Sequence, residues 1–330
     1  MGKRAVITGG GGFIGAYLVK RLCGDGWDVA VVDSMLRGDA SRFAEVAGEV
    51  DLHTVDVRDE EALIGAFEGA EVVFHLAAVN GTENFYNYPE LVLDVGIRGA
   101  IAVMNAARRA GVPDIVAAST AEVYQTPNVL PTPEEISLTL PNSINPRYSY
   151  GGSKIATELI AMNYGRETFR KVQVFRPHNV YGPDMGWKHV IPQFILRADA
   201  QVQSAESGGN VPFKIQGNGF ETRAFAYVDD VVDGIVKMYA NGSHREIYHI
   251  GNDKEVTIRD LVTLVGETLG VELDIQPTAS AEGGTPRRCP DISKMRALGY
   301  EPGIDLREGV RRTAIWYMAN RDRLPASELM

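Results

Sequence analysis

A run of glycines between two apolar stretches is the feature that most limits how this chain can fold. Residues 4–8 read as a buried strand, residues 13–22 as an amphipathic helix, and glycines fill positions between them. Gly9, Gly12 and Gly15 permit a tight turn, close approach of a ligand to the backbone, and close packing of the helix on the strand. The helix N-terminus offers free N–H groups and partial positive charge to phosphate oxygens. This order predicts a dinucleotide-binding unit, because a flexible glycine linker would not lie between two buried elements.

Alternation of strand and helix patterns continues through the first half of the chain. Short apolar runs typical of buried strands lie at residues 4–8, 28–32, 51–55, 72–76, 115–118 and 172–175. Amphipathic stretches between several of them lie at 13–22, 91–110 and 153–166. We therefore predict an α/β fold, a doubly wound parallel Rossmann sheet covered by helices on both faces.

Beyond residue 175 the alternation loosens. Turn signals lie at 182–183, 208–210 and 283–284, helical patterns at 229–239, 258–269 and 306–318, and one further strand pattern at 247–250. We expect a dinucleotide-binding domain over residues 1–175, to which part of 224–255 returns. Residues 176–330 are expected to form a smaller C-terminal α/β lobe that binds the substrate.

Charge and cysteine content limit the kinds of partner. The net charge of −10 and the pI near 5.2 argue against a general nucleic-acid or membrane binder. Cys23 and Cys289 are far apart and show no metal-ligand spacing, so we expect free thiols, a reducing compartment and no metal. With no apolar signal core and no apolar run of membrane-spanning length, the sequence favours a cytoplasmic protein.

Asp33 ends the second expected strand, where a carboxylate can accept hydrogen bonds from the adenosine ribose of a dinucleotide. A carboxylate there would repel a 2′-phosphate, so NAD is favoured over NADP. Arg37, four residues later, could soften that preference. The alternative for Asp33 is a solvated turn residue.

Other expected cofactor contacts follow the remaining strands. Asp56 could meet the adenine amino group, and Ala77 and Ala78 would let the cofactor approach the backbone. The neighbouring positions expected to share these contacts are Phe13, Ile14, Val57 and Leu76.

A tyrosine and a lysine four residues apart open the helix before the sixth strand. This spacing places Tyr150 and Lys154 on one helix face, where the ammonium would lower the pKa of the phenol and make it a general base. Thr120 follows the fifth strand at the same carboxyl edge of the sheet and could share a proton with Tyr150. The alternative for Thr120 is a helix or loop cap.

Seven segments in this order resemble the extended short-chain dehydrogenase/reductase family, in particular its NAD-dependent nucleotide-sugar epimerases, dehydratases and decarboxylases. They are TGGGGFIG at 8–15, HLAA at 75–78, STAEVY at 119–124, YGGSK at 150–154, RPHNVYGP at 176–183, GNGFETR at 217–223 and RRCPD at 287–291.

The resemblance implies a role for each matching residue. Tyr150 would take the proton from the sugar 4-hydroxyl while hydride passes from C4 to NAD, Lys154 would hold the nicotinamide ribose, and Thr120 would bond the same hydroxyl. The substrate would be a nucleotide diphosphate sugar, whose implied contacts are Asn179, Arg223 and, more weakly, Arg288, Lys188 and His189. Apart from the family, Arg223 could equally form a surface ion pair.

The residues after Thr120 separate the possible reactions. Dehydratases of this family carry Thr-Asp-Glu, whereas Ala121 here removes the acid for a departing 6-hydroxyl. Glu122 could be a C5 base, as in decarboxylases, 3,5-epimerases or dehydratases, or could merely position its loop. Gly96 stands where many relatives carry Asn.

We favour a 4-epimerase with tightly bound NAD and a transient 4-keto sugar. A decarboxylase, a 3,5-epimerase or an atypical dehydratase is the alternative. Two further alternatives lie outside this group of enzymes: a non-catalytic NAD-binding sensor and a dehydrogenase that releases NADH. The long, alanine-rich helices at 91–110 and 153–166 also suggest a homodimer.

Overall fold

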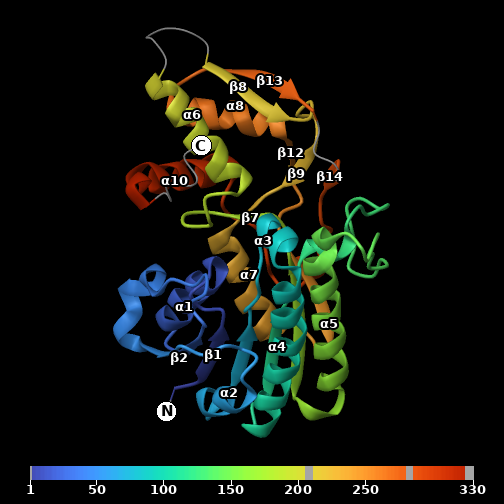
Figure 1. Cartoon of the computed structure of the whole chain (residues 1–330). Helices are drawn as coiled ribbons and strands as arrows, with labels where there is room; N and C mark the ends of the chain where they lie inside the picture. Colours follow the sequence, from blue (N-terminus) through green and yellow to red (C-terminus); the bar gives the residue numbers. More distant parts are fainter. Residues whose placement is uncertain (1, 205–210, 280–284, 324–330) are drawn as a thin grey trace.

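Seven parallel strands form the centre of the protein (Figure 1). The computed structural model describes residues 2–204, 211–279 and 285–323. The strands are β1 (Arg4–Thr8), β2 (Asp28–Val32), β3 (Val50–His53), β4 (Val72–His75), β5 (Asp114–Ala118), β6 (Lys171–Pro177) and β11 (Glu246–Ile250). Their order across the sheet is β11-β6-β5-β4-β1-β2-β3, and each neighbouring pair is parallel. The order reverses beside β1, the point where ligands bind in doubly wound sheets.

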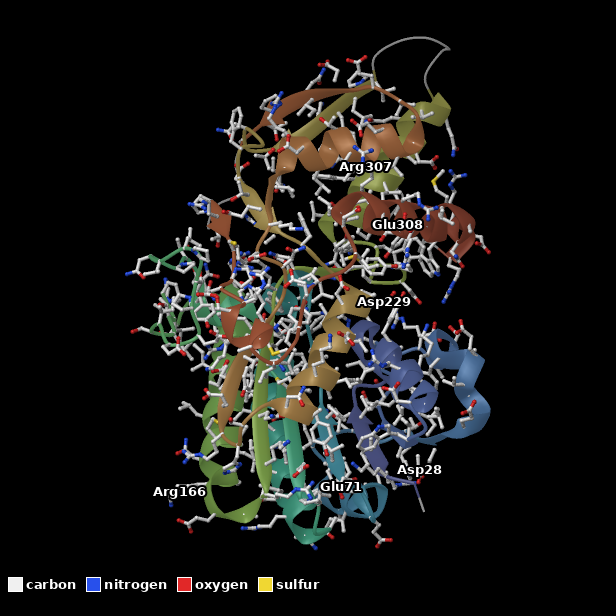
Figure 2. All side chains as sticks on the ribbon, turned by 180° about the vertical axis from the view of Figure 1, so that it is seen from behind. Asp28, Glu71, Arg166, Asp229, Arg307 and Glu308 are labelled. Carbon is white, nitrogen blue, oxygen red and sulfur yellow. The ribbon has the colours of Figure 1, made fainter. Side chains whose placement is uncertain are left out.

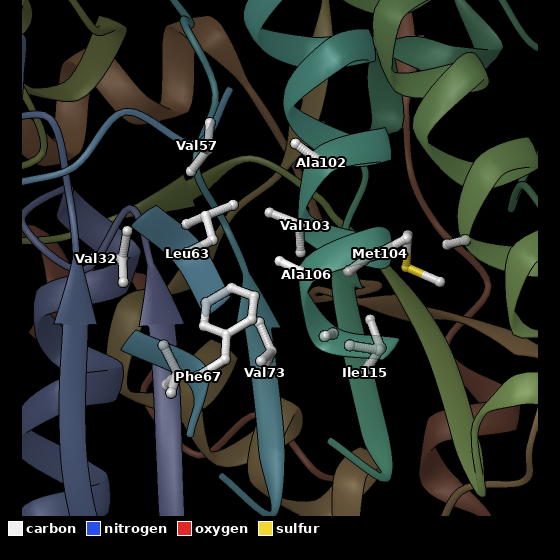
Figure 3. Packing of buried hydrophobic residues seen from close by; sticks show 14 of the residues in the cluster. Val32, Val57, Leu63, Phe67, Val73, Ala102, Val103, Met104, Ala106 and Ile115 are labelled. Carbon is white, nitrogen blue, oxygen red and sulfur yellow. The ribbon is translucent and has the colours of Figure 1, made fainter. Parts of the chain in front are cut away.

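Helices cover both faces of this sheet, as the sequence predicted. On one face pack α2 (Glu60–Phe67), α4 (Pro89–Arg109) and α5 (Ser149–Thr168), and on the other α1 (Phe13–Gly24) and α7 (Val228–Asn241). Figure 3 shows the first of these cores, in which Leu63 and Phe67 of α2 and Val103 of α4 face the strands. Alternate residues of each strand enter opposite cores, so every central strand is apolar on both sides.

The smaller lobe has its own apolar core. Its helices are α6 (Val190–Ser204), α8 (Ile258–Leu269) and α10 (Leu306–Ala319). Three small sheets accompany them: β8 (Val211–Gln216) with β13 (Leu273–Thr278), β12 (Glu255–Thr257) with β9 (Thr222–Ala224) and β14 (Arg287–Arg288), and β7 (Val180–Tyr181) with β10 (Ala226–Tyr227). Figure 1 shows this lobe above the carboxyl edge of the central sheet.

Short elements connect these parts. They are α3 (Thr82–Asn87), α9 (Ser293–Arg296), and the 3-10 segments η1 (Ala40–Glu49), η2 (Ala121–Tyr124), η3 (Pro146–Tyr148) and η4 (Arg321–Arg323).

Most predicted elements are present. The strand pattern at 247–250 is β11, which pairs with β6. The third strand ends at His53, two residues earlier than expected, and α2, α3 and α6 were not predicted. The turn signals at 208–210 and 283–284 lie outside the described residues.

Two further findings concern cysteines and membranes. Cys23 and Cys289 are both buried and free, as expected. Within the described residues, none of the helices combines the length and apolarity needed to span a bilayer.

Candidate active site

The glycine turn after β1 leaves no room for a side chain at Gly9 or at Gly15. Gly9 has a φ of 75°, and a Cβ on Gly15 would lie 2.2 Å from the Gly9 carbonyl oxygen. The Gly12 N–H donates to that oxygen at 3.0 Å, and α1 begins at the next residue without a side-chain cap. The first N–H groups of α1 are therefore left for a ligand, the arrangement that suits a pyrophosphate.

At the end of β2, the Asp33 carboxylate is held by backbone. Its Oδ2 accepts from Gly11 N at 2.9 Å and its Oδ1 from Met35 N at 2.9 Å. A Cβ on Gly38 would lie 2.6 Å from Oδ1, so the chain passes close to the carboxylate. Asp33 is a buried, fixed acceptor with lone pairs to spare, which a solvated turn residue would not be.

A single cavity of about 540 Å³ runs along the carboxyl edge of the sheet. The predicted cofactor residues that line it are Gly9, Gly12, Phe13, Ile14, Gly15, Asp33, Arg37, Asp56, Val57, Leu76, Ala77, Ala78, Tyr150 and Lys154. Thr120, Glu122, Asn179, His189 and Arg288 line the same cavity. The structure thus brings together residues from both halves of the chain.

Asp56 lies in this cavity but is already engaged. Arg58 donates to its Oδ2 at 2.6 Å and also to Asp94 at 2.6 Å. The hydrogen bond from Arg58 holds the pKa of Asp56 below its ordinary value. Asp56 therefore belongs to an ion-pair network that borders the cavity.

Tyr150 and Lys154 lie on one face of α5, as their spacing predicted, and both are buried. The Thr120 side chain hydrogen-bonds the Tyr150 phenol. The Lys154 ammonium donates to the Ala118 carbonyl at 2.8 Å, just before Thr120. The base candidate and its neighbours are thus fixed between β5 and α5.

The prediction that Lys154 lowers the pKa of Tyr150 is wrong for the protein chain alone. Burial, with a smaller contribution from the Glu122 charge, raises the pKa of Tyr150 to about 12, against the Thr120 hydrogen bond and the charge of Arg37. Burial also lowers the pKa of Lys154 to about 8. The lysine donates to a backbone carbonyl, and burial, not the lysine charge, sets the direction of the pKa shift of the phenol.

Glu122 and Arg288 form an ion pair at 2.6 Å. Burial opposes ionisation of Glu122, but the charge and hydrogen bond of Arg288, with the charges of Arg147 and Arg223, outweigh it and lower the pKa of Glu122. Glu122 is therefore an ionised carboxylate among three cations. Arg288, a weak candidate from the sequence, is placed at the centre of the site.

The remaining substrate candidates are less central. Asn179, with a φ of 42°, donates from Nδ2 to the Ala224 carbonyl at 3.0 Å. Arg223 does not line the cavity, and its Nη1 donates to the Thr222 carbonyl at 2.7 Å. Lys188 lies outside the cavity and pairs with Glu83 at 2.6 Å.

Two residues near the site were missed by sequence reasoning. The ring of Phe85, from α3, stacks on Tyr150 with centroids 5.1 Å apart and planes at 9°. Arg147, three residues before Tyr150, lies close enough to Glu122 for its charge to act on it. Neither belongs to a recognisable motif, and a six-residue helix such as α3 is too short to show periodicity.

Comparison with known proteins identifies similar chains. Residues 5–251 match the model of the NAD dependent epimerase/dehydratase family. The chain is 31% identical to UDP-glucuronic acid decarboxylase 1 of Xenopus tropicalis, covering 96% of this chain and 72% of that protein. It is also 31% identical to a putative UDP-glucose 4-epimerase of Methanocaldococcus jannaschii, covering 96% and 99%.

Solved structures of nucleotide-sugar enzymes are also similar to this chain. A dTDP-glucose 4,6-dehydratase from Streptomyces venezuelae, solved with NAD, matches with a TM-score of 0.84 and 30% identity over 98% of this chain and 99% of that one. A UDP-glucose 4-epimerase from Thermotoga maritima, solved with UDP-glucose, matches with a TM-score of 0.85 and 27% identity over 96% and 99%.

Proposed function

The chain belongs to the NAD dependent epimerase/dehydratase family, and we propose that it is a nucleotide-sugar 4-epimerase that works through a transient 4-keto sugar. The observation that carries the proposal is the convergence of Tyr150, Lys154 and Thr120 in the cavity that also contains the glycine turn and Asp33. A non-catalytic sensor would have no need of a buried phenol and ammonium beside a cofactor cleft.

The residues present fit NAD. The crowded glycine turn leaves N–H groups for a pyrophosphate, Asp33 is a fixed acceptor for ribose hydroxyls, and Ala77 and Ala78 leave room beside the backbone. When bound, NAD supplies an acceptor for hydride from the sugar and returns that hydride later.

Tyr150 performs the proton chemistry in this proposal. It takes the proton of the sugar 4-hydroxyl and gives it back once the ketone is reduced from its other face. The Thr120 hydroxyl and the Arg37 charge favour the phenolate, but in the protein alone burial outweighs them and raises the pKa of Tyr150. Phe85 covers one face of the ring and shields the phenol from water.

The smaller lobe supplies the substrate contacts. We propose that residues 176–330, apart from the part of 224–255 that returns to the sheet, hold a nucleotide diphosphate sugar. Arg288 lines the cavity and pairs with Glu122, and the charge of Arg223 acts on the same carboxylate, so both arginines suit the diphosphate. Asn179 lines the same cavity as Arg288 and the cofactor residues.

A decarboxylase is the second candidate, favoured by the Glu122–Arg288 pair. The charges of Arg288, Arg147 and Arg223 all act at Glu122, and positive charge at this point suits a sugar that carries a carboxylate at C5. UDP-glucuronic acid decarboxylases are among the similar proteins. A dehydratase or 3,5-epimerase would need Glu122 as a free base, and its ion pair with Arg288 weakens that role.

Product analysis tests the proposal. The purified protein is incubated with UDP-glucose, UDP-N-acetylglucosamine, UDP-glucuronate and dTDP-glucose, and the products are identified by NMR. A 4-epimer supports the 4-epimerase, and a UDP-pentose with released CO2 supports the second candidate. Unchanged sugars from a wider panel of nucleotides would overturn both.

We also propose a homodimer formed through α4 and α5. These helices lie side by side (Figure 1) and expose apolar side chains, among them Leu93 and Leu159, the latter 60% exposed. An exposed apolar face of this kind favours association. A solution mass of one chain, 36.0 kDa, would contradict the dimer.

A further inference from the structure

Arg37 crosses the cofactor cleft instead of remaining beside Asp33. It follows β2, yet its guanidinium Nη1 donates to the carbonyl of Asn80, which follows β4. In the sheet, β1 lies between β2 and β4, and the glycine turn follows β1. The Arg37 side chain therefore spans the carboxyl edge of the sheet at the end of β1, where the glycine turn lies, and it lines the same cavity as that turn.

We propose that Arg37 grips the pyrophosphate of the bound dinucleotide from the side opposite the glycine turn and so retains NAD through the catalytic cycle. This inference rests on the proposed cofactor site. It replaces the expectation that Arg37 modulates the choice between NAD and NADP at the ribose. The glycine turn supplies backbone N–H groups on one side, and Arg37 supplies a full charge on the other.

The charges around Arg37 support an anionic ligand. Among the described residues the Arg37 side chain hydrogen-bonds a neutral carbonyl, whereas the neighbouring Arg42 pairs with Asp184 at 3.2 Å. Arg37 as a residue is exposed, but its guanidinium reaches into the cavity, where desolvation and the charge of Arg42 lower its pKa. Arg37 and Arg42 both line the cavity, and of these two only Arg42 forms an ion pair within the described part of the chain, so the charge of Arg37 is left for a phosphate to balance.

The Asn80 carbonyl, to which Arg37 donates, also bonds the segment that packs on Tyr150. Asn84 donates from Nδ2 to the same Asn80 carbonyl at 2.7 Å, and the next residue is Phe85, which stacks on Tyr150. The charge of Arg37 acts on the Tyr150 phenol and offsets a small part of the rise in its pKa that burial causes. One arginine thus links the cofactor cleft to the segment that covers the general base.

The experiment measures release of NAD from the protein as purified, after dilution into excess adenosine diphosphoribose. Arg37→Gln should release NAD roughly tenfold faster or more, because a charge-assisted hydrogen bond to phosphate is lost. Arg37→Lys keeps the charge but lacks the planar guanidinium that can donate two hydrogen bonds at once. Its rate of NAD release should therefore lie between those of wild type and Arg37→Gln. The matched control is Arg307→Gln, because Arg307 lies on α10 of the smaller lobe, pairs with Glu267 and is 69% exposed (Figure 2).

Binding of two smaller probes locates the contact. Adenosine diphosphoribose contains the pyrophosphate and AMP does not contain it, so Arg37→Gln should weaken the first and leave the second unchanged. NAD release from Arg37→Gln at the wild-type rate, or a change confined to NADP, would overturn the inference. Wild-type protein that retains NAD but converts no nucleotide sugar would overturn the proposed function and leave the role of Arg37 intact.

Discussion

The Glu122 carboxylate and the Arg288 guanidinium meet at 2.6 Å although they lie 166 residues apart in the chain. Glu122 belongs to η2, directly after the fifth strand of the sheet, and Arg288 to β14 of the smaller lobe. The pair therefore joins the two lobes within the cavity that contains Tyr150. It also keeps Glu122 ionised, which makes the charge of this carboxylate depend on the smaller lobe.

Replacement of Glu122 by Gln separates the candidate reactions. A 4-epimerase needs no proton transfer at C5, so Glu122→Gln should retain turnover within about tenfold of wild type, the loss reflecting the unpaired Arg288. A reaction that uses Glu122 at C5 should lose at least about 100-fold. Turnover of each variant is measured by NMR, together with solvent deuterium incorporation at C5 in the wild type. Deuterium at C5 would contradict the 4-epimerase.

Tyr150→Phe should abolish turnover and leave NAD bound. The substitution removes the general base but keeps the ring that packs on Phe85, so we expect a loss of about 100-fold or more in kcat with little change in Tm. Bound NAD is measured by its absorbance after denaturation. Tyr164→Phe, which alters an exposed tyrosine of the same helix, is the control. Activity of Tyr150→Phe close to that of Tyr164→Phe would exclude Tyr150 as the base.

The buried ammonium of Lys154 should lower the free energy of unfolding at neutral pH. Burial lowers its pKa from 10.5 to about 8, so between these values the unfolded chain binds more protons than the folded one. The contribution of Lys154 to the free energy of unfolding therefore rises with pH across this window. At pH 7, removal of the buried charge in Lys154→Met should raise the free energy of unfolding by about 1–3 kcal/mol relative to wild type. Loss of the hydrogen bond to the Ala118 carbonyl reduces this gain.

The check is the difference in unfolding free energy between Lys154→Met and wild type, measured by urea titration from pH 7 to 10. The advantage of the variant should shrink as the pH rises, because wild type loses its buried charge. A variant that is less stable than wild type at every pH, by a constant amount, would show that burial does not destabilise the ammonium.

Gly15→Ala should disrupt the cofactor turn. The new Cβ would lie 2.2 Å from the Gly9 carbonyl oxygen, a backbone atom, so α1 must move away from β1. We expect a loss of roughly 2–4 kcal/mol in stability and loss of bound NAD. The matched control is Gly24→Ala at the other end of α1, where a Cβ meets nothing within 4 Å. Equal melting temperatures and NAD contents in both variants would refute the crowding argument.

Sequence patterns predicted the sheet and most of the residues that line the candidate site, because those features are local or follow from strand order. The glycine turn, Asp33 and the Tyr150–Lys154 face each depend on a few neighbouring residues, and parallel strands bring their carboxyl ends to one edge. The pairing of Glu122 with Arg288 and the stacking of Phe85 on Tyr150 depend on contacts between distant segments. No motif or residue spacing in the sequence predicts either contact.

The pKa of Tyr150 could not be predicted for a related reason. The motif places a cation near the phenol, but burial is a property of everything packed around α5 and acts in the opposite direction. Likewise, the position of Arg37 four residues after Asp33 suggested a role at the ribose, whereas its side chain extends to Asn80.

The central claim is an internal redox cycle at C4 of a nucleotide sugar, and a substrate labelled with deuterium at C4 tests it most directly. If hydride leaves C4 and returns to the same carbon, the 4-epimerised product retains the deuterium at C4 and no NADH accumulates in solution. Loss of the label from C4 of the product, to free NADH or to water, would contradict the account.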